Sequence, residues 1–274
     1  SQDTAGPMTK TVMGAAMMLN AMATGAAKTD YAATLDAAAL QGKRIGVLRG
    51  AQGSSPLVKD SFEQALSAME SAGAILVDID DIDMPDGFWG KSFDVLKYEF
   101  KATLNAYLAS TPDTVTTRTL ADLIAFNAEH ADIELALFNQ DIFEQSEGME
   151  DLESDGYKEA VAFVQSATRE NGIDRLLAEH DVIALVAPSG PLAPRADPVN
   201  GDVWPDWAGA GYAAAIAGYP HLTVPMGTVR KDQDAAILSL GYAYEQRTQA
   251  RAEPQYYQTA EDLPEIAEAM RRRD

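Results

Sequence analysis

The feature that most constrains the fold is a strand–helix–strand pattern in the first third of the chain. A run rich in aliphatic residues, RIGVLRG (44–50), precedes a segment with helical apolar spacing, SSPLVKDSFEQALSAMESAG (54–73), and the strand-like run AILVDID (74–80) follows. Ser55 and Pro56 supply an N-cap and a proline at the first helical position. Two strands joined by a crossover of helical length pair in parallel, so the pattern predicts an α/β fold.

Two further apolar runs are expected to extend this sheet, DVIALVA (181–187) and HLTVP (221–225). The run VIALVA is apolar at every position, which predicts a strand that is covered on both faces. We therefore predict a mixed, largely parallel central sheet with helices on both faces. The helices are expected over 9–23, with Pro7 in the first turn, 88–108, 119–130, 157–180 with a break at NGID (171–174), within 207–220, and 233–251.

Composition excludes several classes of partner. The 274 residues, 46% of them hydrophobic, suit one large domain with a sizeable core. Acidic residues outnumber basic ones by 42 to 21, a net charge of −21, which opposes binding to nucleic acid or to an anionic membrane. No apolar run approaches the roughly 20 residues that span a bilayer. We expect neither a nucleic-acid nor a membrane partner.

Cysteine and histidine usage restricts the chemistry. The chain has no cysteine, so disulfides and thiolate nucleophiles are excluded. The histidines His130, His180 and His221 lie far apart and lack the H-E-x-x-H spacing of a zinc site. We expect no metal and no cofactor. The compartment stays open between bacterial cytoplasm and periplasm.

Two serine-containing stretches each allow a structural and a functional interpretation. Ser54 and Ser55 follow Gly53, as serines do in some hydrolases, but Ser-Pro before a helix also suits a helix cap, which we favour. Ser189 and Gly190 follow a buried strand, where ligands bind in open α/β sheets, and a plain rigid loop is the alternative.

Two other stretches are interpreted as structural. Met13, Met17, Met18 and Met22 lie on or near one face of the first predicted helix, and core packing is expected of them. The acidic stretch FNQDIFEQSEGMED (138–151) lacks the ligand spacing of a calcium loop, so a solvated helix face is expected.

Seven stretches together resemble the amidase signature family, in the right order along nearly the whole chain, and the likeness is greatest to its peptide-amidase-like branch. The most specific are the S-x-D-x-x-G-P-M opening and A-G-Y-P-x-x-T-V-P-M-G. The seven are SQDTAGPMTKTVMGAAMMLNAMATG (1–25), GKRIGVLRG (42–50), LKYEFKATLNAYLAS (96–110), LADLIAFNAEHADIELALFNQDIFEQSE (120–147), DVIALVAPSGPLAP (181–194), AAAIAGYPHLTVPMG (213–227) and LGYAYEQRTQAR (240–251).

The resemblance implies a Ser–Ser–Lys triad that acts without a metal, but places it upstream of this chain. In the family the base lysine, the relay serine, the nucleophilic serine and the oxyanion-hole amides all precede the S-x-D-x-x-G-P-M motif. Ser1 then corresponds to the first residue after the catalytic half, so no catalytic residue is expected here. Residues 1–274 are expected to form the C-terminal portion of a single amidase domain. The resemblance places Asp3, Gln140, Ser189 and Tyr219 nearest the substrate cleft.

The chain departs from the family pattern at GTVRK (227–231). Family members insert a Gly-Leu-Pro-Val-Gly-like strand between the T-V-P-M-G stretch and the last long helix, whereas here Arg230 meets Lys231 directly. Loss of a central strand would leave its neighbours with unpaired backbone groups. Either the sequence omits residues there or the fragment is damaged.

The expected function is that of the substrate-channel half of a serine-dependent amidase, which hydrolyses carboxamides to acid and ammonia. Alone, this half is expected to be inactive. Its partners would be a small-molecule or peptide amide and either the missing N-terminal half or a partner chain. Two alternatives stay open: a catalytically dead binding or assembly module that pairs with another chain, and a self-contained serine hydrolase that uses Ser54 or Ser189 in an unrecognised arrangement.

Overall fold

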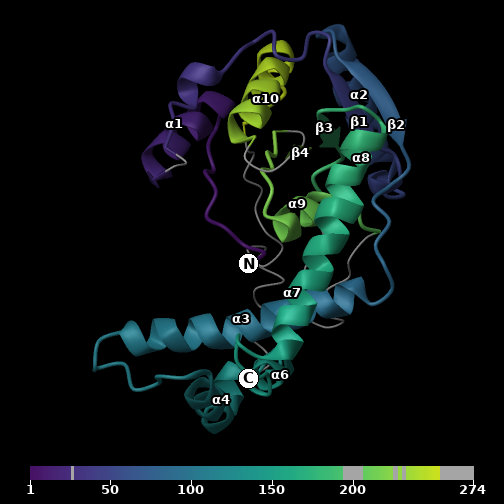
Figure 1. Cartoon of the computed structure of the whole chain (residues 1–274). Helices are drawn as coiled ribbons and strands as arrows, with labels where there is room; N and C mark the ends of the chain where they lie inside the picture. Colours follow the sequence, from purple (N-terminus) through teal and green to yellow (C-terminus); the bar gives the residue numbers. More distant parts are fainter. Residues whose placement is uncertain (26–27, 194–205, 225–227, 230–232, 254–274) are drawn as a thin grey trace, which may run out of the picture.

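A four-stranded sheet forms the centre of the body of the molecule (Figure 1). The computed structural model describes residues 1–25, 28–193, 206–224, 228–229 and 233–253. The strand order is β2-β1-β3-β4, with β1 parallel to both β2 and β3 and with β4 antiparallel to β3. The strands are β1 (Arg44–Leu48), β2 (Ile75–Ile79), β3 (Ala184–Val186) and β4 (Thr228–Val229). The largely parallel sheet predicted from the sequence is confirmed for its three parallel strands.

The stretch HLTVP was wrongly predicted as a strand. His221 makes a single bridge, and residues 222–224 are irregular. Val224 instead joins a core cluster with Val12 and Leu238, and Leu222 packs against it. Pro225, the last residue of the stretch, lies outside the described residues. Pro220, just before the stretch, lacks the N–H group that a central strand needs, and over 222–224 side-chain packing takes the place of ladder pairing.

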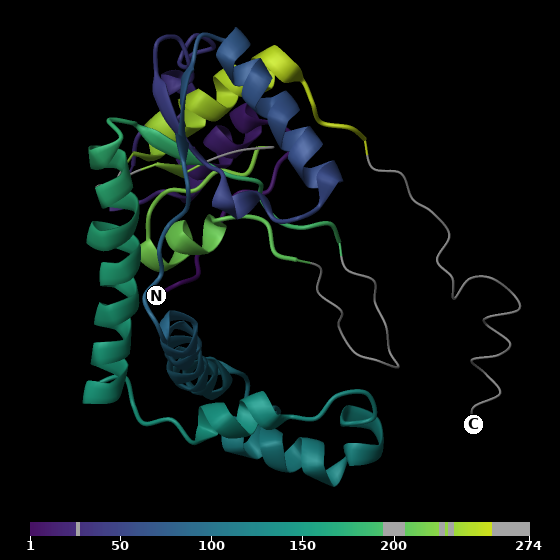
Figure 2. The same cartoon turned by 90° about the vertical axis from the view of Figure 1, so that its right-hand side faces the viewer.

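Helices cover both faces of the sheet, as the sequence predicts (Figure 2). Ile45, Val47 and Val186 pack on one face with the apolar sides of α2 (Pro56–Ser71) and α10 (Asp234–Thr248). Leu48, Ile79 and Leu185 pack on the opposite face with α8 (Asp174–Glu179) and α9 (Gly211–Ala217). This alternation follows the two-residue period of a strand.

One position of VIALVA departs from the expected burial. The three residues of β3 are fully buried, but Ile183, just before the strand, is 45% exposed. Its backbone N–H still donates to the Arg44 carbonyl (3.0 Å). Hydrogen bonding to β1 therefore begins one residue before the part of β3 that the helices cover.

A helical arm projects below the body (Figure 1). Its longest helix, α3 (Phe88–Ser110), packs against α7 (Asp155–Thr168), which rises toward the sheet. Three shorter helices complete the arm. They are α4 (Leu120–Glu129), α5 (Ala131–Glu134) and α6 (Asp141–Glu147).

The break predicted at 171–174 is a wide π turn, Arg169–Ile173, which joins α7 to α8. Gly172 is required in this turn, because a Cβ there would lie 2.6 Å from the Ala167 carbonyl oxygen. The Arg169 Nε donates to the carbonyl of Ala217, at the end of α9, over 2.7 Å. The turn therefore ties the arm to the helix that ends beneath the sheet.

The first helix differs from its prediction in two ways. It spans α1 (Val12–Met22), with Thr11 as the N-cap whose hydroxyl accepts from the Gly14 N–H, so Pro7 lies outside the helix. The methionine face predicted as core is exposed, because small residues, among them Ala15 and Ala16, form the buried side. The exposed fractions are 36% for Met13, 60% for Met17, 44% for Met18 and 41% for Met22.

Ser55 occupies the N-cap position of α2, as predicted, but its hydroxyl makes no capping hydrogen bond. Thr119, by contrast, completes a capping box at α4: its hydroxyl accepts from the Asp122 N–H (3.1 Å), and the Asp122 carboxylate accepts from the Thr119 N–H (2.9 Å). Pro56 at the first turn compensates at α2 by fixing the backbone.

Because only one of these N-cap side chains makes a capping hydrogen bond, replacing each with alanine should change the free energy of unfolding by different amounts. Thr119→Ala should lower the free energy of unfolding by about 1 kcal/mol, because an orphan N–H at the helix start loses its acceptor. Ser55→Ala should lower the free energy of unfolding by at most a few tenths of that amount, because no capping hydrogen bond is lost. Chemical denaturation of both variants measures the difference, and equal costs would contradict it.

Candidate functional site

A cavity of about 1650 Å³ lies between the N-terminal segment, α1, the loop after α9, and α10. We call residues 1–11 the strap, because they run from the arm to the start of α1 along this cavity (Figure 1). Across from the strap, residues 218–224 and the α10 side chains of Asp234 and Glu245 line the cavity. Both apolar and ionisable groups therefore face the space.

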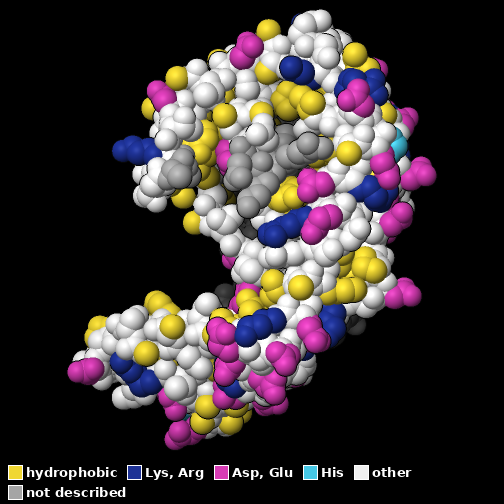
Figure 3. Space-filling view, viewed as in Figure 1, with side chains coloured by type: hydrophobic (Ala, Val, Ile, Leu, Met, Phe, Trp, Pro, Cys, Tyr) yellow, Lys and Arg dark blue, Asp and Glu magenta, His cyan; other side chains and the backbone are white. Residues whose placement is uncertain are grey.

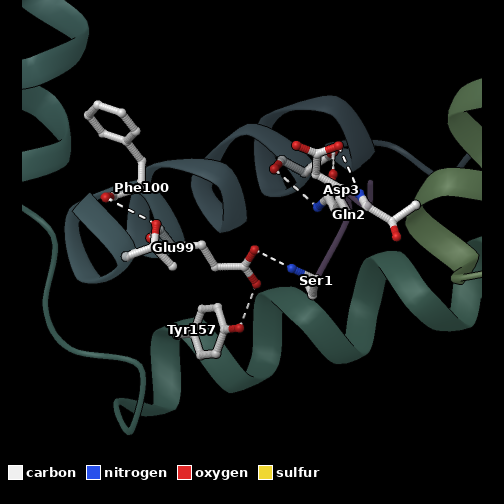
Figure 4. Close-up of polar contacts among 9 residues, drawn as sticks. Ser1, Gln2, Asp3, Glu99, Phe100 and Tyr157 are labelled. Atoms are coloured by element: carbon white, nitrogen blue, oxygen red, sulfur yellow. Dashed lines mark hydrogen bonds and ion pairs between the residues drawn. The ribbon is translucent and has the colours of Figure 1, made fainter. Parts of the chain in front are cut away.

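The strap is fixed to the arm at its first two residues (Figure 4). The Ser1 nitrogen donates to the Glu99 Oε2, and the Tyr157 hydroxyl donates to the Glu99 Oε1 over 2.7 Å. The Gln2 side chain donates to the Ser92 carbonyl (3.4 Å) and accepts from the Ser92 hydroxyl (3.0 Å).

The other end of the strap is fixed to the body. The Glu245 Oε1, on α10, accepts from the Val12 N–H over 2.9 Å, where α1 begins. Sequence analysis missed both anchoring carboxylates. Neither lies in a short motif, and each partner is distant in the chain, so no local pattern marks them.

Two of the expected site residues meet at this cavity. Asp3 and Tyr219 both line it. The Asp3 Oδ1 accepts from the Thr4 N–H (2.8 Å), a bond that stays within residues 1–11. The Tyr219 hydroxyl donates to the Asp174 Oδ2 on α8 (2.7 Å), and burial together with this carboxylate raises the pKa of Tyr219 to about 12.

Ser189 lines a separate cavity of about 990 Å³, bounded by α2, α10 and the segment after β3. It follows the carboxyl end of β3, as expected for a ligand-facing loop. Gly209 lets another segment approach there, since a Cβ on it would lie 2.9 Å from the Pro188 carbonyl oxygen and its φ is +113°. Tyr244 and Thr248 border both cavities, so the two are neighbours across α10.

Gln140 lies in the arm, away from both cavities. Its side chain donates to the Ile124 carbonyl and accepts from the Asn127 amide, each over 3.2 Å. These bonds join the start of α6 to α4. The structure thus brings Asp3 and Tyr219 together, with Ser189 nearby and Gln140 apart.

His221 is a further cavity residue that the expected set lacked. It lines the larger cavity, and its ring lies against Gly211, where an added Cβ would be 3.1 Å from the Cε1. The signal in the sequence was its place in the A-G-Y-P-x-x-T-V-P-M-G stretch.

In the described part of the chain, no serine hydroxyl is hydrogen-bonded to a lysine or histidine side chain. Ser54 is exposed, and Ser55 starts a helix. Within the same ranges, no group of three or more histidine and acidic side chains could hold a metal ion, and no helix combines the length and apolar character that crossing a bilayer requires. The geometry therefore offers binding surfaces, with no activated serine among the described residues.

The chain matches the family model described as Amidase over residues 1–248. It belongs to the amidase signature family. The peptide amidase of Stenotrophomonas maltophilia is similar, with 33% identity, a TM-score of 0.76, and coverage of 92% of this chain and 55% of that one. A peptide amidase in complex with the competitive inhibitor chymostatin gives 33% identity and a TM-score of 0.74, with coverage of 93% and 56%.

A sequence relative from Arthroderma benhamiae, whose name contains the word amidase, is 29% identical over 303 aligned residues. The match covers 91% of this chain and 47% of the relative. The chain thus spans about half the length of the amidase family proteins it matches.

Three half-buried tyrosines predict a delayed alkaline titration. Burial first, and a nearby carboxylate second, raise the pKa values of Tyr157, Tyr212 and Tyr219 to about 12 each. Because these lie above the unfolded value of about 10, the protonated phenols stabilise the fold fully below about pH 10, and this is lost as the pH rises through the folded-state values. Ultraviolet absorbance of tyrosinate should show a late component near pH 12 to which these three tyrosines contribute.

The variant Asp174→Asn isolates one of them. It removes the carboxylate beside Tyr219, so the pKa of that hydroxyl should fall, while the pKa of Tyr157 should stay at about 12. An unchanged titration in Asp174→Asn would contradict the assignment.

Proposed function

We propose that this chain is the substrate-channel half of a serine-dependent amidase that hydrolyses carboxamides to a carboxylic acid and ammonia. In this proposal a complementary half, the part of the amidase domain that precedes the S-x-D-x-x-G-P-M motif, supplies the nucleophile, its base and the oxyanion donors. The chain described here supplies cavity walls and the sheet that supports them. Residues 1–274 then form the C-terminal portion of one amidase domain.

One observation carries the proposal. The family model matches residues 1–248, yet the match extends over only 55% of the peptide amidase of Stenotrophomonas maltophilia. Among the described residues no serine is hydrogen-bonded to a lysine or histidine side chain, which supports a nucleophile and base supplied by the complementary half. A serine hydroxyl is a poor nucleophile until a base accepts its proton.

Exposed apolar side chains support the proposal that part of the surface binds a partner. Trp89, Phe93 and Leu96 recur at helical spacing along α3 and are 59%, 41% and 43% exposed. The methionine face of α1 is exposed as well. The space-filling view shows a notch between body and arm (Figure 3). Contiguous exposed apolar surface is typical of an interface, and the complementary half is the occupant that we propose.

Within this proposal the site residues have different roles. Asp3 lies on the cavity wall and can accept a hydrogen bond from an amide N–H. Tyr219 supports the wall through its bond to Asp174. Ser189 lines the neighbouring cavity, and Gln140, away from both cavities, joins α6 to α4 within the arm. The substrate class proposed is a small-molecule or peptide amide, since similar proteins are named peptide amidases.

The chain alone should release no ammonia from peptide amides or aryl amides above a heat-denatured control. Loss of a catalytic triad costs about six powers of ten in kcat in a serine protease, and here the oxyanion donors would be missing too. Adding the separately expressed N-terminal part of the Stenotrophomonas peptide amidase, the portion outside the match, should restore ammonia release.

Each alternative makes a different prediction in this assay. Turnover by the chain alone that is lost in Ser54→Ala or Ser189→Ala would establish the self-contained hydrolase. Binding of the added half without turnover would favour a dead assembly module. If the added half neither binds the chain nor gives turnover with it, the proposed pairing is refuted.

A further inference from the structure

We propose that Arg169 and Asp174 are positioning residues that set the place of Tyr219 and of the cavity wall formed by residues 218–224. The inference rests on the proposed function, because it takes the larger cavity as the place where an amide binds. Neither side chain belongs to the described residues that line this cavity. Each acts through the stretch 217–219, to which it is hydrogen-bonded.

Two hydrogen bonds hold the wall, one on each side of Gly218. The Arg169 Nε donates to the Ala217 carbonyl, and the Asp174 Oδ2 accepts from the Tyr219 hydroxyl, each over 2.7 Å. The first bond holds the backbone, and the second holds a side chain. Two attachments at separate atoms restrict both the rotation and the displacement of this stretch, whereas one attachment would leave it free to rotate.

The chain turns sharply between these two attachments. Gly218 has a φ of +68° and ends α9 in the left-handed region, which favours glycine. The Tyr219 N–H closes the turn by donating to the Ala214 carbonyl (2.9 Å). The residues that line the larger cavity continue from this turn over 218–224. The two hydrogen bonds therefore hold the wall at the point where it leaves α9.

The π turn gives both groups a packed base. Ile173 is fully buried and belongs to a core cluster with Leu176 and Leu177 of α8. The same cluster includes Ala217 of α9, and Tyr219 packs against it. Side chains in a close-packed core have little freedom to shift. The groups that bind the wall are therefore attached to a part of the fold that is packed against the sheet.

Charge strengthens both hydrogen bonds. The Arg169 guanidinium lies at the C-terminal end of α9, where the helix dipole favours a cation. At the second bond the acceptor is the Asp174 carboxylate, and a hydrogen bond to a charged group is stronger than one between neutral groups. Arg169, Asp174 and Tyr219 are all half-buried, so water competes less for these groups than at the exposed surface.

The far end of the wall has separate support. Val224 is buried in a core cluster with Val12 and Leu238. Loss of the two hydrogen bonds should therefore free residues 218–221, while the far end and the sheet stay packed. The expected effect is local to the part of the wall that carries the tyrosine.

Four substitutions test the two groups. Arg169→Ala and Asp174→Ala each remove one hydrogen bond, and Tyr219→Phe removes the second bond from its other partner. Asp174→Asn keeps an acceptor without the charge. Asp174→Asn and Tyr219→Phe also keep the size of the side chain, so they test the same bond with little risk to folding.

Arg175 and Glu179 provide matched controls on α8. The Arg175 Nε donates to the Asn171 carbonyl (3.0 Å), and its Nη1 pairs with the Glu179 carboxylate (2.9 Å). Both bonds connect residues within 171–179. Arg175→Ala and Glu179→Ala therefore remove the same two kinds of side chain from the same part of the chain without removing a bond to the wall.

Amide hydrogen exchange in the whole chain measures the mobility of the wall. The N–H groups of Gly218 and Tyr219 donate to carbonyls of α9, so their exchange requires local opening. Exchange at these two amides should rise about tenfold in Arg169→Ala, Asp174→Ala and Tyr219→Phe, with a smaller rise in Asp174→Asn. It should stay unchanged in both controls. Exchange over β1 should stay slow in every variant, which reports that the sheet remains folded.

The chain paired with the complementary half gives a second readout. Displacement of Tyr219 should raise KM for N-acetylphenylalaninamide about tenfold with kcat changed less, since the proposed nucleophile lies on the other half. A merely structural role would instead lower the melting temperature and the amount of active pair at unchanged KM. Asp174→Asn should recover part of the KM loss seen in Asp174→Ala.

The two proposals fail in distinguishable ways. Unchanged exchange in Arg169→Ala or Asp174→Ala would overturn the positioning role of that residue, whatever the activity of the pair, and so would an equal rise in the two controls. Faster exchange with no change in KM would also overturn it, because the hydrogen bonds would then have no bearing on binding. Absence of turnover by the paired parent would refute the proposed function, while the exchange series would still decide whether the two residues hold the wall.

Discussion

The body of the molecule depends on the backbone pairing of β1, which is hydrogen-bonded in parallel register to β2 on one side and to β3 on the other. Ile45 and Val47 then point to one helical layer and Leu48 to the other. Gly46 makes the second layer possible, because a Cβ there would lie 2.7 Å from Ile79 and 2.8 Å from Leu185. A larger residue at this position would therefore have to displace the ends of two side chains that pack against α8 and α9.

Local patterns in the sequence predicted the elements that carry their own signals. β1, α2 and β2 follow from aliphatic runs around an amphipathic segment, and the break at 171–174 follows from its glycine. The failures arose where tertiary packing decided. Residues 222–224 have strand-like composition, yet Val224 packs against α1 and α10 and forms no strand.

The methionines of α1 show another limit of pattern analysis. Helical spacing predicts that apolar residues share a face, but not which face meets the core. Small residues such as Ala16 form the buried side, and the larger thioethers remain outside. Within the candidate site, Asp3 and Tyr219 line the same cavity, and their place at a substrate cleft stays a prediction. Glu99 and Glu245 escaped notice because their partners lie 98 and 233 positions away in the chain.

The π turn between α7 and α8 connects the arm to the wall of the larger cavity. Through it, the two helices form one rod that reaches from the arm to the sheet. Near the turn, the Arg169 Nε donates to the Ala217 carbonyl, and the Asp174 carboxylate accepts from the Tyr219 hydroxyl. The rod is therefore hydrogen-bonded to the residues on both sides of Gly218. Gly218 and Tyr219 line the larger cavity, so the hydrogen bonds of the rod connect the arm directly to this part of the cavity wall.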